Sequence, residues 1–157
     1  MSGDAVSRQL VNVLKEAVLG PTGSWSYFTD NRPDAGLLGA LATVSAAEAS
    51  QPWAGSTIAS HVHHVAFALG VSADTIAGDT GPHDWTASWR VTTVDDAAWS
   101  SLLARLRGEH ARLAQAIEAH SSSSEQALGE AVGALAHVAY HLGAVRQKIA
   151  ALRQPTA

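Results

Sequence analysis

The 157-residue chain contains no cysteine and a single methionine. The absence of cysteine excludes disulfides, thiolate nucleophiles and zinc–thiolate sites, so any metal ion has to be held by histidine, aspartate or glutamate. Charged residues are also scarce, at 15% against 46% hydrophobic residues. A composition this apolar predicts that several helix faces are buried, and that one of them is shared in a homodimer.

Basic charge is equally limited. The formal net charge is -4, and the ten lysines and arginines are scattered along the chain, which excludes an extended phosphate backbone as the partner. The first twenty residues carry Asp4, Arg8, Lys15 and Glu16, so they lack the uninterrupted apolar stretch of a signal peptide or a membrane span. We therefore expect a cytoplasmic protein that binds neither nucleic acid nor membrane.

The length of the chain predicts a single domain over residues 1–157. Apolar residues recur at helical spacing in four stretches, which predicts long helices over residues 4–19, 57–69, 95–119 and 125–152. A shorter helix is expected over residues 37–44. No stretch alternates apolar and polar residues as a half-buried strand would. The expected fold is therefore all-α, an up-and-down four-helix bundle with long connections after its first and second helices.

Residues that favour helix ends mark these boundaries. Asp4 is expected to cap the first long helix, and Ser56 the second. Gly70 leaves open whether the second helix resumes over residues 73–77. Ser122 and Glu125, three residues apart, match a capping box at the start of the last helix.

Two long connections contain aromatic residues. The first holds Trp25, Tyr27 and Phe28, which we expect to pack onto the bundle. The second, Gly78 to Thr93, holds Trp85 and Trp89. Two interpretations of this second loop stay open: its tryptophans line a site as a wall or lid, or they fill the end of the bundle.

The strongest sign of chemistry is a pair of histidines in the last predicted helix. His137 and His141 are four residues apart, so their imidazoles point to the same side of a helix and can hold one ion. Ala134, Val138 and Val145 border them, which predicts that the pair is at least partly buried. A buried imidazole nitrogen needs a partner, at a cost of about 1–3 kcal/mol when it has none.

The second predicted helix carries three more of the eight histidines, namely His61, His63 and His64. His61 and His64 share a helix face, so either can meet the pair in the last helix, whereas His63 points away and is expected at the surface. Three histidine ligands suit Zn²⁺, Ni²⁺, Fe²⁺ or Cu²⁺ better than Mg²⁺ or Ca²⁺, and they leave a coordination position open. The remaining histidines are expected in loops or on the solvent side: His83, His110 and His120.

The segments GSTIASHVHHVAFAL and LAHVAYHLGAVRQ, with DWTASW and DDAAW between them, resemble the DinB/YfiT-like superfamily of metal-dependent proteins. The resemblance implies a four-helix bundle that binds one divalent ion, zinc or nickel or else iron. It also implies that the helix-two ligand follows a Thr-Ile or Ser-Ile pair by six residues. Ile58 then selects His64 and leaves His61 in reserve, so the predicted ligands are His64, His137 and His141.

Most members of this superfamily with assigned chemistry use thiols, either to transfer them to electrophiles or to isomerise maleylpyruvate, and many other members have no known activity. The resemblance therefore implies a metalloenzyme that acts on a small electrophile with a small-molecule thiol, because a metal ion lowers the pKa of a bound thiol. No general base can be assigned; Glu48, Glu130 and Asp84 are candidates by residue type alone. Tyr140 and Arg146 are expected to support packing or a subunit contact. The alternative is a non-catalytic dimeric bundle with a structural metal or a stress-related binding role.

Overall fold

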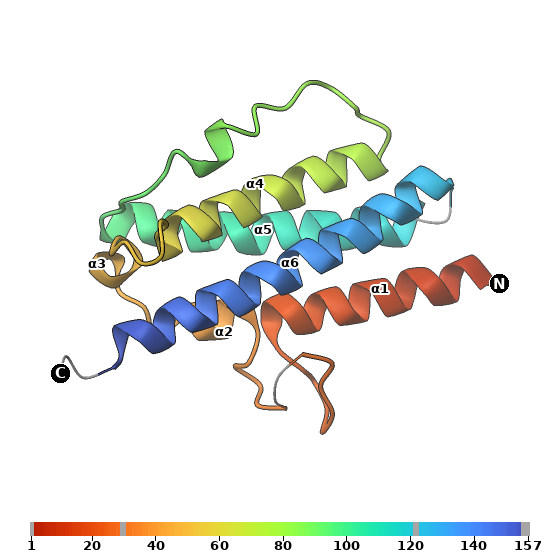
Figure 1. Cartoon of the computed structure of the whole chain (residues 1–157). Coiled ribbons are helices and arrows are strands. Elements are labelled where there is room, and N and C mark those ends of the chain that lie inside the picture. Colours follow the sequence, from red (N-terminus) through yellow and green to blue (C-terminus); the bar gives the residue numbers. More distant parts are fainter. Residues whose placement is uncertain (1, 29–30, 121–122, 155–157) are drawn as a thin grey trace.

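The computed structural model describes residues 2–28, 31–120 and 123–154, and this part of the chain contains helices and no β-strand (Figure 1). The predicted all-α class is therefore confirmed. Four long helices and three short ones follow in the order α1 (Ser2–Leu19), α2 (Leu37–Leu41), α3 (Ala46–Ala49), α4 (Ile58–Ile76), the 3₁₀ turn η1 (Ala87–Trp89), α5 (Asp96–His120) and α6 (Glu125–Leu152). None of the described helices is both long and apolar enough to cross a membrane.

Helices α4 and α5 run in the same direction. Thr57, immediately before α4, donates from its hydroxyl to the carbonyl of Thr92, shortly before α5, at 2.9 Å. Towards the other end of α4, Asp74 pairs with Arg112 of α5. The alternating up-and-down order that the sequence suggested is therefore wrong for this pair. The parallel direction of α4 and α5 is possible because the connection over residues 77–95 is long enough to return along the whole of α4 before α5 begins (Figure 1).

Helix α6 runs antiparallel to α4, whereas α1 lies beside α6 and points the same way (Figure 1). Two hydrogen bonds fix the register of α4 and α6: His61 contacts His141 at one level, and Ser72 donates to Glu130 at the other. This antiparallel register brings the middle of α4 against the middle of α6. The histidines of the two helices are therefore neighbours in space.

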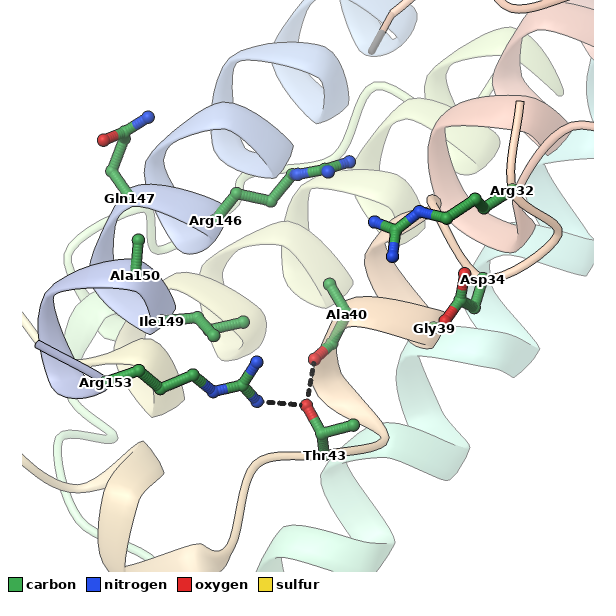
Figure 2. A pocket seen from close by; sticks show the side chains of 10 residues that line it. All are labelled: Arg32, Asp34, Gly39, Ala40, Thr43, Arg146, Gln147, Ile149, Ala150 and Arg153. Atoms are coloured by element: carbon green, nitrogen blue, oxygen red, sulfur yellow. Dashed lines mark hydrogen bonds between the residues drawn. The ribbon is translucent and has the colours of Figure 1, made fainter. Parts of the chain in front are cut away.

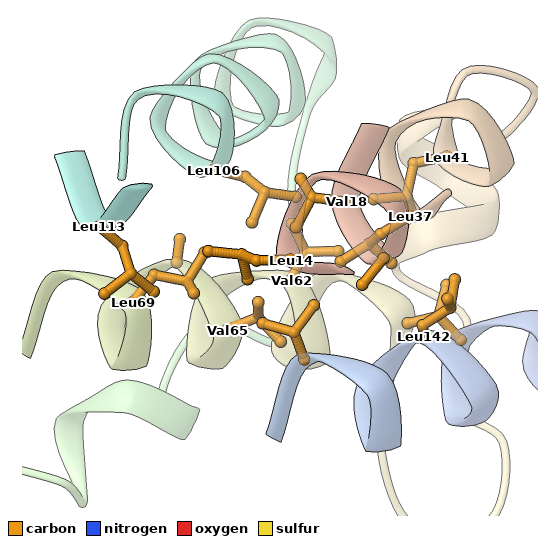
Figure 3. Close-up of a cluster of buried hydrophobic side chains, with 14 of the residues drawn as sticks. Leu14, Val18, Leu37, Leu41, Val62, Val65, Leu69, Leu106, Leu113 and Leu142 are labelled. Carbon is orange, nitrogen blue, oxygen red and sulfur yellow. The ribbon is translucent and has the colours of Figure 1, made fainter. Parts of the chain in front are cut away.

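The core is built from apolar side chains of all four long helices, together with α2 (Figure 3). Leu14 of α1, Val62 of α4, Leu106 of α5 and Leu142 of α6 are each at most 2% exposed. Burial of such a side chain contributes about 1.5–3 kcal/mol. Helix α5 turns one face to the core, and its buried residues are Trp99, Leu102, Leu106, His110, Leu113, Ala114 and Ile117.

The helix starts differ in detail from the prediction. Thr57, and not Ser56, caps α4, because it forms a reciprocal capping box with Ser60. Helix α4 continues through Gly70 without a break. Ser124 caps α6 by accepting from the amide of Ala127. The predicted partner Ser122 lies outside the described residues, and α1 begins at Ser2, so Asp4 lies within that helix.

The aromatic residues of the first connection are only partly packed. Trp25 and Tyr27 are 64% and 60% exposed, and they contact each other edge to face with ring centroids 4.1 Å apart. Phe28 alone packs against the core. The prediction that all three pack onto the bundle is therefore wrong for two of them. A mutual aromatic contact shields part of each ring without help from the core.

The C-terminal half of α6 is held against α2 and the residues that flank it (Figure 2). Arg153 donates to the hydroxyl of Thr43 at 2.5 Å, and Arg146 donates to the carbonyl of Ala35 at 3.0 Å. These side chains, with Arg32 and others, line a cavity of about 500 Å³. Arg146 thus has the packing role that the sequence suggested, and it anchors the helix that carries His137 and His141.

Candidate metal centre

The three histidines predicted as ligands lie together between α4 and α6. One ring nitrogen from each of His64, His137 and His141 lies within 4.8 Å of the others, an arrangement that could hold a metal ion. The Nε2 atom of His137 is 3.0 Å from Nε2 of His64 and 2.9 Å from Nε2 of His141. Helical spacing aims the α6 pair at one side, and the antiparallel packing of α4 supplies the third ring.

Burial keeps these three histidines neutral. His64 and His141 are 8% and 2% exposed, whereas His137 is half-buried. Burial, together with a smaller effect of repulsion between the neighbouring rings, lowers the pKa of His64 to about 4 and the pKa of His141 to about 3. Burial also lowers the pKa of His137. At neutral pH each ring therefore carries one proton and one lone pair.

A serine from the loop after α4 fixes the proton of His64. Ser88 is fully buried, and its hydroxyl donates to the carbonyl of Trp85 at 2.6 Å. The same oxygen lies 2.7 Å from Nδ1 of His64. Because a hydroxyl has only one proton to donate, this oxygen accepts from His64, and Nδ1 carries the ring proton. Nε2 of His64 is left with a lone pair, and it faces His137.

A fourth histidine stands behind His141. Nδ1 of His61 lies 2.8 Å from Nδ1 of His141, and Nε2 of His61 lies 3.0 Å from the hydroxyl of Ser56. Burial, followed by the charge of Lys148, lowers the pKa of His61 to about 4. His61 is therefore neutral as well, and it contacts the side of His141 that faces away from the three Nε2 atoms.

Protons alone cannot satisfy the three converging nitrogens. His64 offers only a lone pair, so its contact with His137 needs the Nε2 proton of His137. The contact between His137 and His141 needs one further proton on an Nε2 atom. If His141 donates this proton, Nε2 of His137 would have to donate to His64 and accept from His141 at the same time. A ring nitrogen carries either a proton or a lone pair in the ring plane, and not both. One of the two contacts is therefore left without a matched donor and acceptor: its nitrogens face each other with two lone pairs or two protons, or compete for a single shared proton.

A divalent metal ion removes this conflict, because it accepts all three lone pairs at once. Nitrogens bound at 2.0–2.1 Å are about 2.9 Å apart at a right angle and about 3.3 Å apart in a tetrahedron. The two spacings around His137, 3.0 Å and 2.9 Å, are close to these values, and all three nitrogens lie within 4.8 Å of one another. Neutral imidazoles favour zinc and the later first-row transition metals. The donor set of His64, His137 and His141 thus fits the ion that the sequence predicted.

Aromatic side chains of the loop after α4 flank the site. Trp89 stacks on the ring of His64, with centroids 4.1 Å apart and an angle of 20° between the planes. Trp85 packs edge to face on Phe67 at 5.4 Å. The two indoles are 40% and 47% exposed. This placement agrees with a wall beside the site, the first of the two interpretations that the sequence left open.

Two of the remaining histidines differ from their predicted surroundings. His63 is half-buried, and its Nδ1 donates to the carbonyl of Ser88 at 2.7 Å, so it holds the loop and is not a free surface residue. His110 is 4% exposed inside the bundle, and its Nε2 has no partner in the described structure. The prediction that His110 faces solvent is wrong, because it lies on the same face of α5 as Leu106 and Leu113. His120 is exposed as expected.

The three acidic candidates each have a local partner. Glu48 completes the capping box of α3 with Ser45, Glu130 accepts from Ser72, and Asp84 pairs with Arg90: these contacts are 2.8, 2.6 and 3.1 Å long. They give the carboxylates structural roles. Tyr140, which is 71% exposed, touches the ring of His141 edge to face.

Sequence reasoning missed Ser88 and the role of Ser56. Both lie outside the long helices, so no periodicity relates them to the histidines. The only available signal was the proximity of Ser88 to Trp85 and Trp89 in a loop suspected of lining a site.

Comparison of the chain with protein-family models, with curated proteins and with solved structures finds no match. The resemblance to the DinB/YfiT-like superfamily therefore depends on the motifs themselves.

Proposed function

We propose that this chain is a DinB/YfiT-like four-helix-bundle protein in which His64, His137 and His141 bind one divalent transition-metal ion, zinc or nickel or else iron. The observation that carries the proposal is the pair of short contacts that converge on Nε2 of His137, because one ring nitrogen of a neutral imidazole cannot donate to one neighbour and accept from the other. The fixed proton of His64, set by Ser88, makes that conflict unavoidable.

The proposed activity is thiol-dependent transfer or isomerisation with a small electrophile as the substrate. A bound metal ion supplies a positive charge that lowers the pKa of a coordinated thiol or water. Three features of this chain support the proposal. The site has three protein ligands, as catalytic zinc sites do. One of those ligands, His137, is half-buried. The exposed indoles of Trp85 and Trp89 offer an apolar surface beside it.

The second candidate is a structural metal in a non-catalytic bundle. The burial of His64 and His141 favours it, since closed structural sites are usually shielded from solvent. The two candidates differ in what the ion accepts: a catalytic ion binds an added small thiol directly, and a structural ion does not. The expected homodimer and the expected lack of nucleic-acid binding stay predictions.

Substitution of a predicted ligand tests the metal site. Purified protein should contain one metal ion per chain by elemental analysis, and His141→Ala should lose it while its helical circular dichroism is kept. His63→Ala is the comparison on α4: His63 binds the carbonyl of Ser88 and none of the three Nε2 atoms, so its loss should loosen a loop anchor and still leave one metal ion per chain. Unchanged metal content in His141→Ala, or equal loss in both variants, would refute the assignment.

Addition of a small thiol tests the proposed chemistry. In the Co²⁺-loaded protein, a thiol that binds the ion produces a new sulfur-to-cobalt charge-transfer absorption band. We expect this band with the wild-type chain and not with His137→Ala. A cobalt spectrum that does not change at millimolar thiol would favour the structural metal.

A further inference from the structure

We propose that His61 is a positioning residue of the metal site, which accepts the Nδ1 proton of His141 and so turns the Nε2 lone pair of His141 towards the ion. The inference rests on the proposed metal site and assigns a separate role to a histidine that is not one of its ligands. It also assigns different roles to His61 and His64 of α4, which periodicity could not distinguish.

The contact between the two Nδ1 atoms contains one proton, because two neutral rings 2.8 Å apart hydrogen-bond only when one donates. That proton can belong to either ring. If it belongs to His61, the remaining proton of His141 lies on Nε2 and blocks the lone pair that an ion needs. If it belongs to His141, Nε2 of His141 is free to bind. Metal binding therefore requires His61 to be the acceptor.

The surroundings of His61 accommodate the acceptor form. With its Nδ1 accepting, the proton of His61 lies on Nε2, where the hydroxyl of Ser56 is 3.0 Å away. Ser56 is itself held in place, because Lys148 of α6 donates to its carbonyl at 3.0 Å. The result is a continuous chain of hydrogen bonds from His141 through His61 to Ser56. Ser88 performs the same task for His64, because its hydroxyl accepts the Nδ1 proton of that ring.

His61 is poorly placed to be a ligand itself. Its Nδ1 is directed at Nδ1 of His141, on the far side of that ring from the Nε2 atoms of His64 and His137. Its Nε2 is directed at Ser56. The ring also packs against Trp89, with centroids 5.4 Å apart and the planes nearly perpendicular. Both nitrogens are thus engaged with partners other than the converging nitrogens.

The test compares three versions of the full chain. In His61→Leu the acceptor is lost and a side chain of similar bulk fills the space. In His61→Asn the amide oxygen takes the place of Nδ1 and restores an acceptor. The dissociation constant for Zn²⁺ is measured by competition with a chelator, and we expect it to rise about 10–100-fold in His61→Leu and to recover most of that loss in His61→Asn.

A spectroscopic measurement reports the proton itself. In the zinc-loaded wild-type protein with ¹⁵N-labelled histidine, the Nδ1 proton of His141 should be observed as a slowly exchanging resonance. It should vanish in His61→Leu and return in His61→Asn. The Co²⁺ absorption spectrum should keep its band positions and intensity in His61→Leu, because the ligands of the ion are unchanged.

His110→Leu is the matched control for removal of a buried histidine, because His110 lies on α5 with no contact to the three ligands. Its zinc affinity should equal that of the wild-type chain. Equal affinities in His61→Leu and the wild type would overturn the inference, and so would equal losses in His61→Leu and His61→Asn. A changed cobalt coordination number in His61→Leu would make His61 a ligand and overturn it too. Failure of the wild-type chain to bind zinc would instead refute the proposed function.

Discussion

Ser88 decides which nitrogen of His64 faces the centre of the site. It is fully buried, and its one proton is already donated to the carbonyl of Trp85. Ser88→Ala leaves the Nδ1 proton of His64 without an acceptor, so the ring is free to move its proton to Nε2 and lose the lone pair that binds the ion. We expect zinc affinity to fall about 10-fold or more, measured by competition with a chelator.

Ser72→Ala provides the comparison for Ser88→Ala. Ser72 is a buried serine of α4 that donates to Glu130 at 2.6 Å, away from the three ligands. Loss of this hydrogen bond should lower the free energy of unfolding by about 1 kcal/mol and leave zinc affinity unchanged. The same affinity loss in both variants would show that Ser88 acts through general stability alone.

His110 makes the stability of the protein sensitive to acid. Burial, with smaller effects from the charges of Lys15 and Arg107, lowers its pKa from 6.5 to about 4. Below pH 6.5 the unfolded chain takes up a proton here that the folded chain refuses. The stabilisation is therefore complete above pH 6.5, and it is lost as the pH falls towards 4.

His110→Leu should remove this sensitivity. Between pH 7 and pH 5 the unfolding free energy of the variant should fall by about 1–2 kcal/mol less than that of the wild type, measured by urea denaturation without added metal. The buried cluster histidines remain in both proteins, so their contribution cancels in the comparison. His120→Leu, at an exposed position, should match the wild type. A variant that follows the wild-type pH profile would contradict the assigned cause.

The sequence predicted some of the site residues better than others, for physical reasons. The side shared by His137 and His141 follows from helix geometry alone, so their spacing was sufficient. The choice between His61 and His64 depends on the register of α4 against α6, which periodicity does not contain. The motif resemblance selected His64, and the structure places it with the pair. Ser88 was out of reach, because its position depends on how a loop folds back onto α4.

At the scale of elements, connection length determined what could be predicted. The apolar spacing identified all four long helices, and the short segment between α5 and α6 forces those two to be antiparallel. The 77–95 connection imposes no such limit. It crosses the full length of α4, and anchors such as His63 to the Ser88 carbonyl hold it there. The direction of α5 therefore depended on tertiary contacts that no local pattern encodes.

The close contact between the end of α1 and the start of α2 depends on glycine. A Cβ atom at Gly36 would lie 2.3 Å from the backbone nitrogen of Gly20, closer than any side chain allows. Gly36→Ala should therefore separate these elements and lower the unfolding free energy by more than about 2 kcal/mol, measured by urea denaturation.

Gly133 in α6 provides the opposite case. A Cβ atom there meets nothing within 4 Å. Gly133→Ala should raise the unfolding free energy by about 0.5–1 kcal/mol, because alanine favours a helix interior over glycine. If Gly36→Ala raises the unfolding free energy as Gly133→Ala does, the close backbone contact at Gly36 does not exclude a side chain there.

At the scale of the whole molecule, the core and the metal site are separate sources of stability. The core cluster draws apolar side chains from all four long helices and does not depend on the histidines. The site adds imidazole nitrogens whose mutual contacts cannot all be matched as donor and acceptor until an ion binds. The metal-free protein should therefore remain folded, in contrast to small zinc domains that unfold without their ion.

Thermal unfolding with and without metal tests this separation. A chelator should leave the helical circular dichroism at 25 °C intact. Zinc at about 1,000 times its dissociation constant should add about 4 kcal/mol, since it binds only the folded state. For a chain of this size that corresponds to a rise in Tm of about 8–16 °C.

In His137→Ala the rise should disappear while the metal-free Tm stays close to that of the wild type, because His137 is half-buried and outside the apolar core. Unfolding by the chelator alone would show that the ion is part of the folding core, and an equal rise in His137→Ala would show that zinc binds elsewhere.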